Sequence, residues 1–171
     1  VIAVANLQAQ IGGLAGRPAA ADRAMLIDLL LLRGHVQARV ADYERAAELA
    51  EHLVEDAPED GTALLARART RGTFHRFTEA LADLDAAGRC GADPDALDAE
   101  RAPILHALGW HAEAEALCRT AAERRADFAT LGALAVLEAE RGRYTEAEQL
   151  FTRARSRYRG TSPFPVASLD F

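Results

Sequence analysis

The sequence contains no lysine, so all 20 of its basic residues are arginines. Aromatic residues make up only 6% of the chain, whereas apolar residues make up 50%, and alanine supplies much of that half. A core that is poor in large rings has to be built from close helix contacts, and alanine is the strongest helix former. The composition therefore predicts an all-helical protein.

Cysteine is scarce as well, since Cys90 and Cys118 are the two present and no CxxC spacing joins them. This scarcity argues against a disulfide scaffold and a cysteine zinc site, and we expect both thiols to be small buried side chains. The sequence also lacks a glycine-rich phosphate loop and a nucleophile elbow. We therefore predict no enzyme, no cofactor and no metal site.

Long apolar runs are missing too. The run AMLIDLLLL at 24–32 is interrupted by Asp28 and is far shorter than a membrane span, so no insertion into a membrane is expected. The formal charge of -6 argues against nucleic acid as a partner, because affinity for phosphate backbones needs basic surface. The opening VIAVA has no basic flank of a signal peptide, and the compartment stays open, with the cytoplasm favoured.

What the sequence does contain is a repeat of about 34 residues, visible as columns of similar side chains. The central column consists of alanines: Ala46, Ala80, Ala114 and Ala147. Twelve residues earlier stands a second column of small residues: Gly34, Ala68, Ala102 and Ala135. Three residues before the alanines stand mostly aromatic side chains: Tyr43, Phe77, His111 and Tyr144. Seven residues after them stand apolar ones: Leu53, Ala87, Ala121 and Ala154.

Small residues at these spacings allow two antiparallel helices to approach to about 8 Å, so each period predicts a helical hairpin. We expect turns inside the hairpins at 35–42, 72–76, 108–109 and 141–143. Breaks between hairpins fall at 56–61 and 91–96, where Asp93 and Pro94 suit the N-cap and first position of a helix. A single domain is predicted over 1–171, with repeats at 22–60, 61–92, 93–126 and 127–159 and a helical lead at 1–21.

The tail at 160–171 has two explanations that the sequence leaves open. TSPFPVASLDF reads as the opening of a further repeat helix, which would make the chain a fragment of a longer repeat protein, or as a short cap on the last hairpin.

These residues resemble the tetratricopeptide repeat family, whose signature is W-x2-L-G-x2-Y, A-x3-F and P. The last repeat matches best, with Leu131, Leu134 and Ala135 followed by Ala147 and Phe151. The resemblance covers about residues 27–159 and implies a right-handed superhelical solenoid of antiparallel helix pairs, with about four repeats. It also implies a non-enzymatic scaffold that binds a protein or peptide in a concave groove lined by the first helix of each repeat.

The chain departs from the family pattern in its third repeat. Asp98 stands where the family prefers tryptophan, and Pro103 falls inside the predicted first helix. An interior proline removes a helical hydrogen bond and clashes with the carbonyl four residues earlier. We therefore expect a bend near Ala99 or a helix that starts later.

The family register implies groove residues in all four repeats: Leu31, His35, Arg39, Leu65, Arg69, Thr73, His106, Val136 and Glu140. It also implies Ala99, Pro103 and Gly132 as further inward positions. Arg39 and Arg69 favour an acidic partner. Chaperone-binding members of the family hold a peptide's terminal carboxylate with lysines and asparagines, but this chain has no lysine and Asn6 lies outside the repeats. That mode of binding does not fit this sequence.

A second hypothesis is self-association, as a homo-oligomer, or docking onto another domain of the same polypeptide through a small-residue face at Ala129, Gly132 and Val136. RARSRYR at 153–159 concentrates positive charge where a helix end favours cations, and it is also a candidate partner surface. His106 and His111 straddle a predicted turn, and His111 occupies the aromatic column, so we expect a buried structural histidine there rather than a metal ligand.

Overall fold

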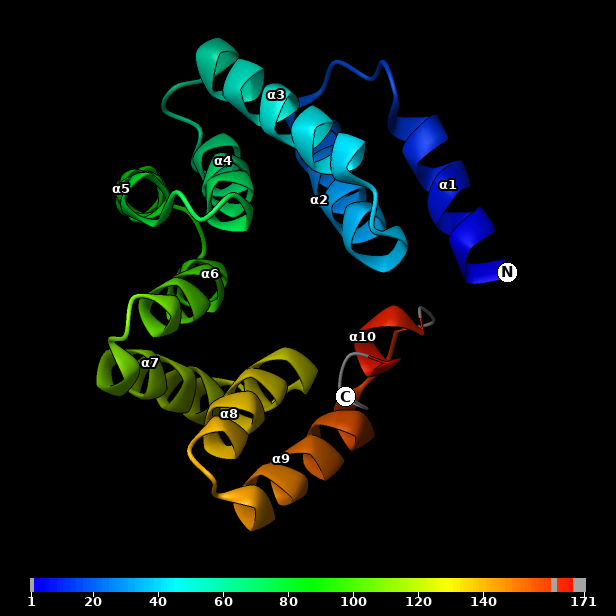
Figure 1. Cartoon of the computed structure of the whole chain (residues 1–171). Helices are drawn as coiled ribbons and strands as arrows, with labels where there is room; N and C mark the ends of the chain where they lie inside the picture. Colours follow the sequence, from blue (N-terminus) through cyan, green and yellow to red (C-terminus); the bar gives the residue numbers. More distant parts are fainter. Residues whose placement is uncertain (1, 161–162, 168–171) are drawn as a thin grey trace. The chain divides into compact units, whose positions relative to one another are not determined.

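The computed structural model describes residues 2–160 and 163–167, and all regular structure in these ranges is helical (Figure 1). The helices in chain order are α1 (Ile2–Leu14), α2 (Ala20–Gln37), α3 (Val40–Asp56), α4 (Gly61–Thr73), α5 (Phe77–Arg89), α6 (Pro94–Ala107), α7 (His111–Arg124), α8 (Phe128–Glu140), α9 (Tyr144–Arg157) and α10 (Phe164–Ala167). The all-helical class predicted from composition is confirmed.

The contacts group the chain into two compact units, residues 1–100 and 101–171, and α6 runs across the boundary. In the first unit, α2 pairs with α3 and α4 pairs with α5, while α1 packs on α2 as the predicted lead helix. In the second unit, α8 pairs with α9 and α7 packs on α8. The single domain over 1–171 and the repeat boundaries remain predictions.

One turn inside a hairpin is shorter than the sequence predicted. α2 continues through Gly34 and His35 to Gln37, and Ala38 then takes a left-handed conformation with φ 52°. The predicted turn at 35–42 was therefore too long, because a single helical glycine does not stop a helix. The other turns, at 74–76, 108–110 and 141–143, lie close to their predicted positions.

The first helices of the last three hairpins start at an aspartate. Asp60 accepts a hydrogen bond from the backbone N–H of Thr62 at 2.8 Å, and Asp127 caps α8 in the same way. Asp93 accepts one from the backbone N–H of Asp95 at 3.3 Å, which confirms its predicted capping role before Pro94. Each cap satisfies donors that a helix start leaves unpaired and so fixes where the hairpin begins.

The small-residue columns form the core. The central alanines and the columns twelve residues before and seven residues after them are buried throughout. The aromatic column behaves differently, because Tyr144 is 72% exposed and His111 is also exposed. Both are the first residue of a second helix, and the prediction of a buried His111 is wrong.

The two cysteines also differ. Cys118 is buried within α7, as expected, whereas Cys90 is exposed because it follows the last residue of α5. The expectation of two buried thiols is correct for one of them.

The tail lies only partly within the described residues. Phe164–Ala167 forms α10, and the rest of 161–171 apart from Pro163 lies outside the described residues. Both explanations of the tail stay predictions.

Gly34 marks the closest approach of α2 and α3. A Cβ added at this position would lie 2.9 Å from Cε1 and 3.0 Å from Cζ of Tyr43. A Cβ at these distances would force the Tyr43 ring to move, so this ring is the reason that position 34 needs a small residue.

Substituting both residues tests this contact. Alanine at a helical position is favoured over glycine by about 1 kcal/mol, whereas overpacking costs about 1–3 kcal/mol. We expect Gly34→Ala to be more favourable in a Tyr43→Ala background than in the wild type by at least about 1 kcal/mol, measured by urea unfolding. Additive effects of the two substitutions would contradict the contact.

Pro103 lies within α6 and is exposed. The helix begins at Pro94, which excludes the later start that the sequence left open. Proline lacks the N–H that would bond the carbonyl of Ala99, so that carbonyl has no helical donor.

Restoring the donor should stabilise α6. Pro103→Ala supplies the missing N–H and removes the ring, so it should raise the free energy of unfolding by up to about 3 kcal/mol, measured by urea unfolding. An unchanged or lower denaturation midpoint would show that α6 does not depend on this hydrogen bond.

Candidate functional site

The guanidinium of Arg69 connects the first helices of three successive hairpins, α2, α4 and the start of α6. Nε of Arg69 on α4 donates to Oε1 of Glu100 on α6 at 2.7 Å. Its Nη1 donates to both carboxylate oxygens of Asp28 on α2, at 2.9 and 3.0 Å. These three partly exposed side chains form what we call the Arg69 cluster.

The charges of the Arg69 cluster are set by its own members. Burial raises the pKa of the Asp28 carboxyl, and Arg69 offsets part of that rise. The two carboxylates raise the pKa of Arg69, which keeps the guanidinium charged despite its burial. Within the described residues its Nη2 group makes no hydrogen bond, so one edge of the guanidinium is unbonded there.

The other groove residues predicted in the first unit differ in how exposed they are. Leu31 is half-buried one turn beyond Asp28, and His35 is exposed one turn further along α2. Leu65 is only 8% exposed and belongs to the core, so it supplies little groove surface. Arg39 is exposed and lies 3.3 Å from the carboxylate of Asp42.

Thr73 is exposed at the end of α4, and its hydroxyl donates to the backbone carbonyl of Arg69 at 2.9 Å. Sequence reasoning did not find Asp28 or Glu100 as partners of Arg69. A signal for the site was present at Asp28, which lies one turn before Leu31 on the same helix face, but not at Glu100, because its neighbour Ala99 lies on a different face of the helix.

In the second unit, two predicted groove residues, His106 and Glu140, lie in contact. Nε2 of His106 on α6 lies 2.9 Å from Oε2 of Glu140 on α8. Nδ1 of His106 lies 3.1 Å from Nδ1 of His111, so one ring donates and the other accepts. Val136, one turn before Glu140, is 44% exposed. Among the described residues, no three histidine, cysteine or carboxylate side chains are arranged to hold a metal ion.

The predicted docking face on α8 is interrupted. Ala129 and Val136 are exposed, but Gly132 between them is buried. Of the further inward positions on α6, both Ala99 and Pro103 are exposed.

A second set of arginines is structural. Arg33 is 7% exposed and donates to both oxygens of Asp42, itself 3% exposed, at 2.7 and 2.6 Å. Arg67, 34 residues later, makes the same two-bond contact with buried Asp83 at 3.0 and 2.8 Å. These arginines stand directly before Gly34 and Ala68, so they form a further repeat column that sequence analysis missed.

The second unit contains a related network around Glu138, which is buried on α8. Arg119 donates to it from α7 at 3.2 Å, and Arg143 donates to it from the start of α9. Glu115 on α7 binds Arg119, Arg141 and Arg143. Burial of these charges is tolerated because each carboxylate is paired and hydrogen-bonded.

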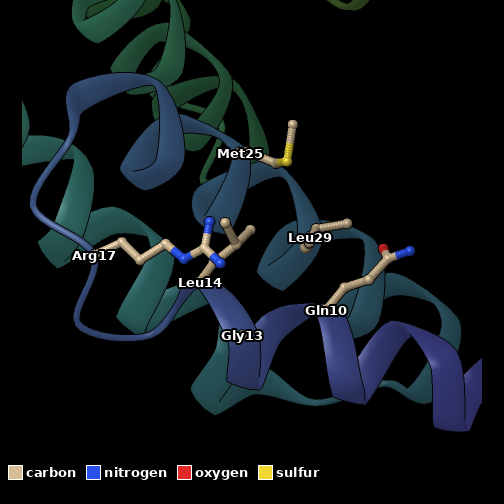
Figure 2. Close-up of a pocket in the computed structure, with 6 residues that line it drawn as sticks. All are labelled: Gln10, Gly13, Leu14, Arg17, Met25 and Leu29. Carbon is tan, nitrogen blue, oxygen red and sulfur yellow. The ribbon is translucent and has the colours of Figure 1, made fainter.

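A hollow of about 630 Å³ opens between α1 and α2. Figure 2 shows Met25 and Leu29 of α2 on one side and Gln10 and Leu14 of α1 on the other, with the guanidinium of Arg17 beside them. It lies outside the predicted groove set. In the ranges that the structure covers, no helix is both long and apolar enough to cross a membrane.

The architecture is similar to that of solved repeat proteins. No protein-family model matches the sequence, and no curated protein matches it. The solved structure of TTC0263, a thermophilic TPR protein of Thermus thermophilus, is similar with a TM-score of 0.73 at 20% identity, over 98% of this chain and 90% of that one.

Two further solved structures are similar. YrrB, described as a TPR protein with an unusual peptide-binding site, has a TM-score of 0.52 at 18% identity, over 88% of this chain and 76% of that one. A tetratricopeptide repeat protein from Parabacteroides merdae has a TM-score of 0.56 at 20% identity, over 95% of this chain and 62% of that one.

Together, the helix pairs and these likenesses define an all-helical repeat protein. Its fold is that of the tetratricopeptide repeat proteins, as the sequence resemblance implied.

The buried Arg33–Asp42 pair predicts acid sensitivity. Hydrogen bonds from Arg33 lower the pKa of Asp42 below its ordinary value of 3.8. A carboxyl with a lowered pKa in the folded state stabilises the fold at neutral pH, and this stabilisation is lost as the pH falls below about 4. Asp42→Asn should reduce the free energy of unfolding at pH 7 by about 3 kcal/mol, because it leaves Arg33 buried without a counter-charge.

The same comparison at lower pH provides the check. The stability difference between wild type and Asp42→Asn should shrink as the wild-type carboxyl is protonated, which urea unfolding at pH 7, 5 and 3 can follow. A difference that stays constant over this range would mean that folding does not lower the pKa of Asp42 and would contradict the pair.

Proposed function

We propose that the chain is a non-enzymatic protein-interaction scaffold that binds a segment of a partner along α2, α4 and the start of α6. The observation that carries this proposal is the Arg69 cluster, in which Asp28 and Glu100 hold a charged guanidinium and leave its Nη2 edge unbonded within the described residues. A guanidinium fixed in this way loses little rotamer entropy when it binds a ligand.

The partner's chemistry follows from that edge. The unbonded Nη2 group donates charge-assisted hydrogen bonds to anionic oxygens, so the partner segment presents an aspartate, a glutamate or a free carboxyl terminus. The cluster contains one cation and two carboxylates, so recognition depends on a direct hydrogen bond rather than on a positive field. Half-buried Leu31 and exposed His35, on the same face of α2, provide neighbouring contact area.

A peptide partner is supported by one similar structure. YrrB shares the fold at 18% identity and is described as having a peptide-binding site. Here we propose a segment in extended or helical form, since both are recognised in grooves by side-chain pockets.

Peptides selected on the immobilised chain from a random display library would test the proposal. Binding of the selected peptides to purified wild type, Arg69→Gln and Glu100→Gln is then compared by fluorescence anisotropy. Loss of a charge-assisted hydrogen bond costs about 1.5–3 kcal/mol, so Arg69→Gln should weaken binding by about tenfold or more.

Two other variants sharpen the result. Glu100→Gln removes a competing carboxylate and should strengthen binding of an acidic peptide. Arg89→Gln removes an exposed arginine from α5 and should leave affinity unchanged. Equal affinity of wild type and Arg69→Gln for every selected peptide would exclude the Arg69 cluster as the recognition site.

A further inference from the structure

We propose that the chain associates with a second copy of itself through two oppositely charged helix faces that lie outside the Arg69 cluster. The acidic face consists of Glu44, Glu48 and Glu55 on α3 of the first unit. The basic face consists of Arg153 and Arg157 on α9 of the second unit. This association does not depend on the proposed groove function, because neither face includes a residue of the groove.

The acidic face is exposed and uncompensated. Glu44, Glu48 and Glu55 are all exposed, and none makes an ion pair within residues 2–160 and 163–167. Residues four and seven apart lie on one side of a helix, so the three carboxylates form a single stripe. Glu44 and Glu48 are about 6 Å apart along the axis.

The basic face has the same spacing. Arg153 and Arg157 are exposed, four residues apart, and lack an ion-pair partner in the part of the chain that the structure describes. Arg159 follows them and, among the described residues, donates to the backbone carbonyls of Ser156 and Tyr158. Arg153 and Arg157 are therefore about 6 Å apart along α9, which matches the spacing of Glu44 and Glu48.

The helix dipole accounts for arginines at the end of α9, but it does not account for the absence of an ion-pair partner among the described residues of their own unit. Arginines such as Arg33 and Arg67 bind carboxylates in this chain at 2.6–3.0 Å. Within the described residues of the second unit, no carboxylate pairs with Arg153 or Arg157, although the chain has a net charge of -6. The charge pattern that complements it, at the same spacing, is present on α3 of another copy.

The strength of such an association is modest. Exposed ion pairs contribute about 0.5 kcal/mol each, well short of the roughly 4 kcal/mol that a dissociation constant of about 1 mM requires, so the pairs orient the contact and the surrounding helix surface supplies the rest. A heterologous contact of this kind joins a face of one copy to a different face of the next.

Charge exchange provides the test, with sedimentation velocity on the full chain up to about 1 mM. One variant carries Arg153→Glu and Arg157→Glu, and another carries Glu44→Arg and Glu48→Arg. Each alone should lose self-association, with a dissociation constant raised by about tenfold or more. Mixing the two variants should restore association, because each then offers the face that the other lacks.

Two controls keep the outcome decisive. A chain with all four substitutions has both faces reversed and should associate like wild type, which a misfolded chain would not do. Glu113→Arg with Glu123→Arg changes the net charge by as much as Glu44→Arg with Glu48→Arg, but on α7, and should leave association unchanged.

The proposal is overturned if wild type stays monomeric over the whole range, or if the single-face variants associate as wild type does. Failure of the mixture to restore association would also overturn it. A glutamate-rich peptide that binds Arg153 and Arg157 more tightly than the second copy would make the basic face a surface for acidic peptides instead.

Discussion

The structure depends on the close approach of paired helices, which small side chains make possible at repeated positions. Gly34 on α2 faces the ring of Tyr43 on α3, and a single added carbon would already be too close. Ala46 and its equivalents one repeat apart are buried as well. Each helix of each hairpin needs a small residue at the contact, so small residues recur in the sequence with the period of the hairpins. A chain with few aromatic residues can build a core in this way.

Arginine provides the polar counterpart of this packing. Arg33 and Arg67 cross from a first helix to a buried carboxylate with two parallel hydrogen bonds, a geometry that lysine cannot reproduce. Burying such a pair adds little net stability, but losing one partner is costly, so the pairs favour one register of the hairpin. Arg69 differs because its two carboxylates come from neighbouring first helices and leave one edge of it unbonded within the described residues.

Much of the fold could be predicted from the sequence because the small-residue columns report directly on helix contacts. The site was harder, since exposure depends on where a side chain lies along its helix. Leu65 fits the inward register and yet lies in the core, and His111 fits the aromatic column and yet lies at an exposed helix start. Asp28 and Glu100 are 41 and 31 residues from Arg69, so only the packing of three helices reveals their contact.

The central claim is that partner segments bind the face of α2 and α4 on which His35 and Arg69 lie. Photo-crosslinking measures this directly. A benzophenone amino acid is placed at position 35, or at position 89 on α5 as the control, and the chain is irradiated in cells of its source organism. We predict that a protein is crosslinked from position 35 and not from position 89. Crosslinking from position 89 alone, with none from position 35, would contradict the account.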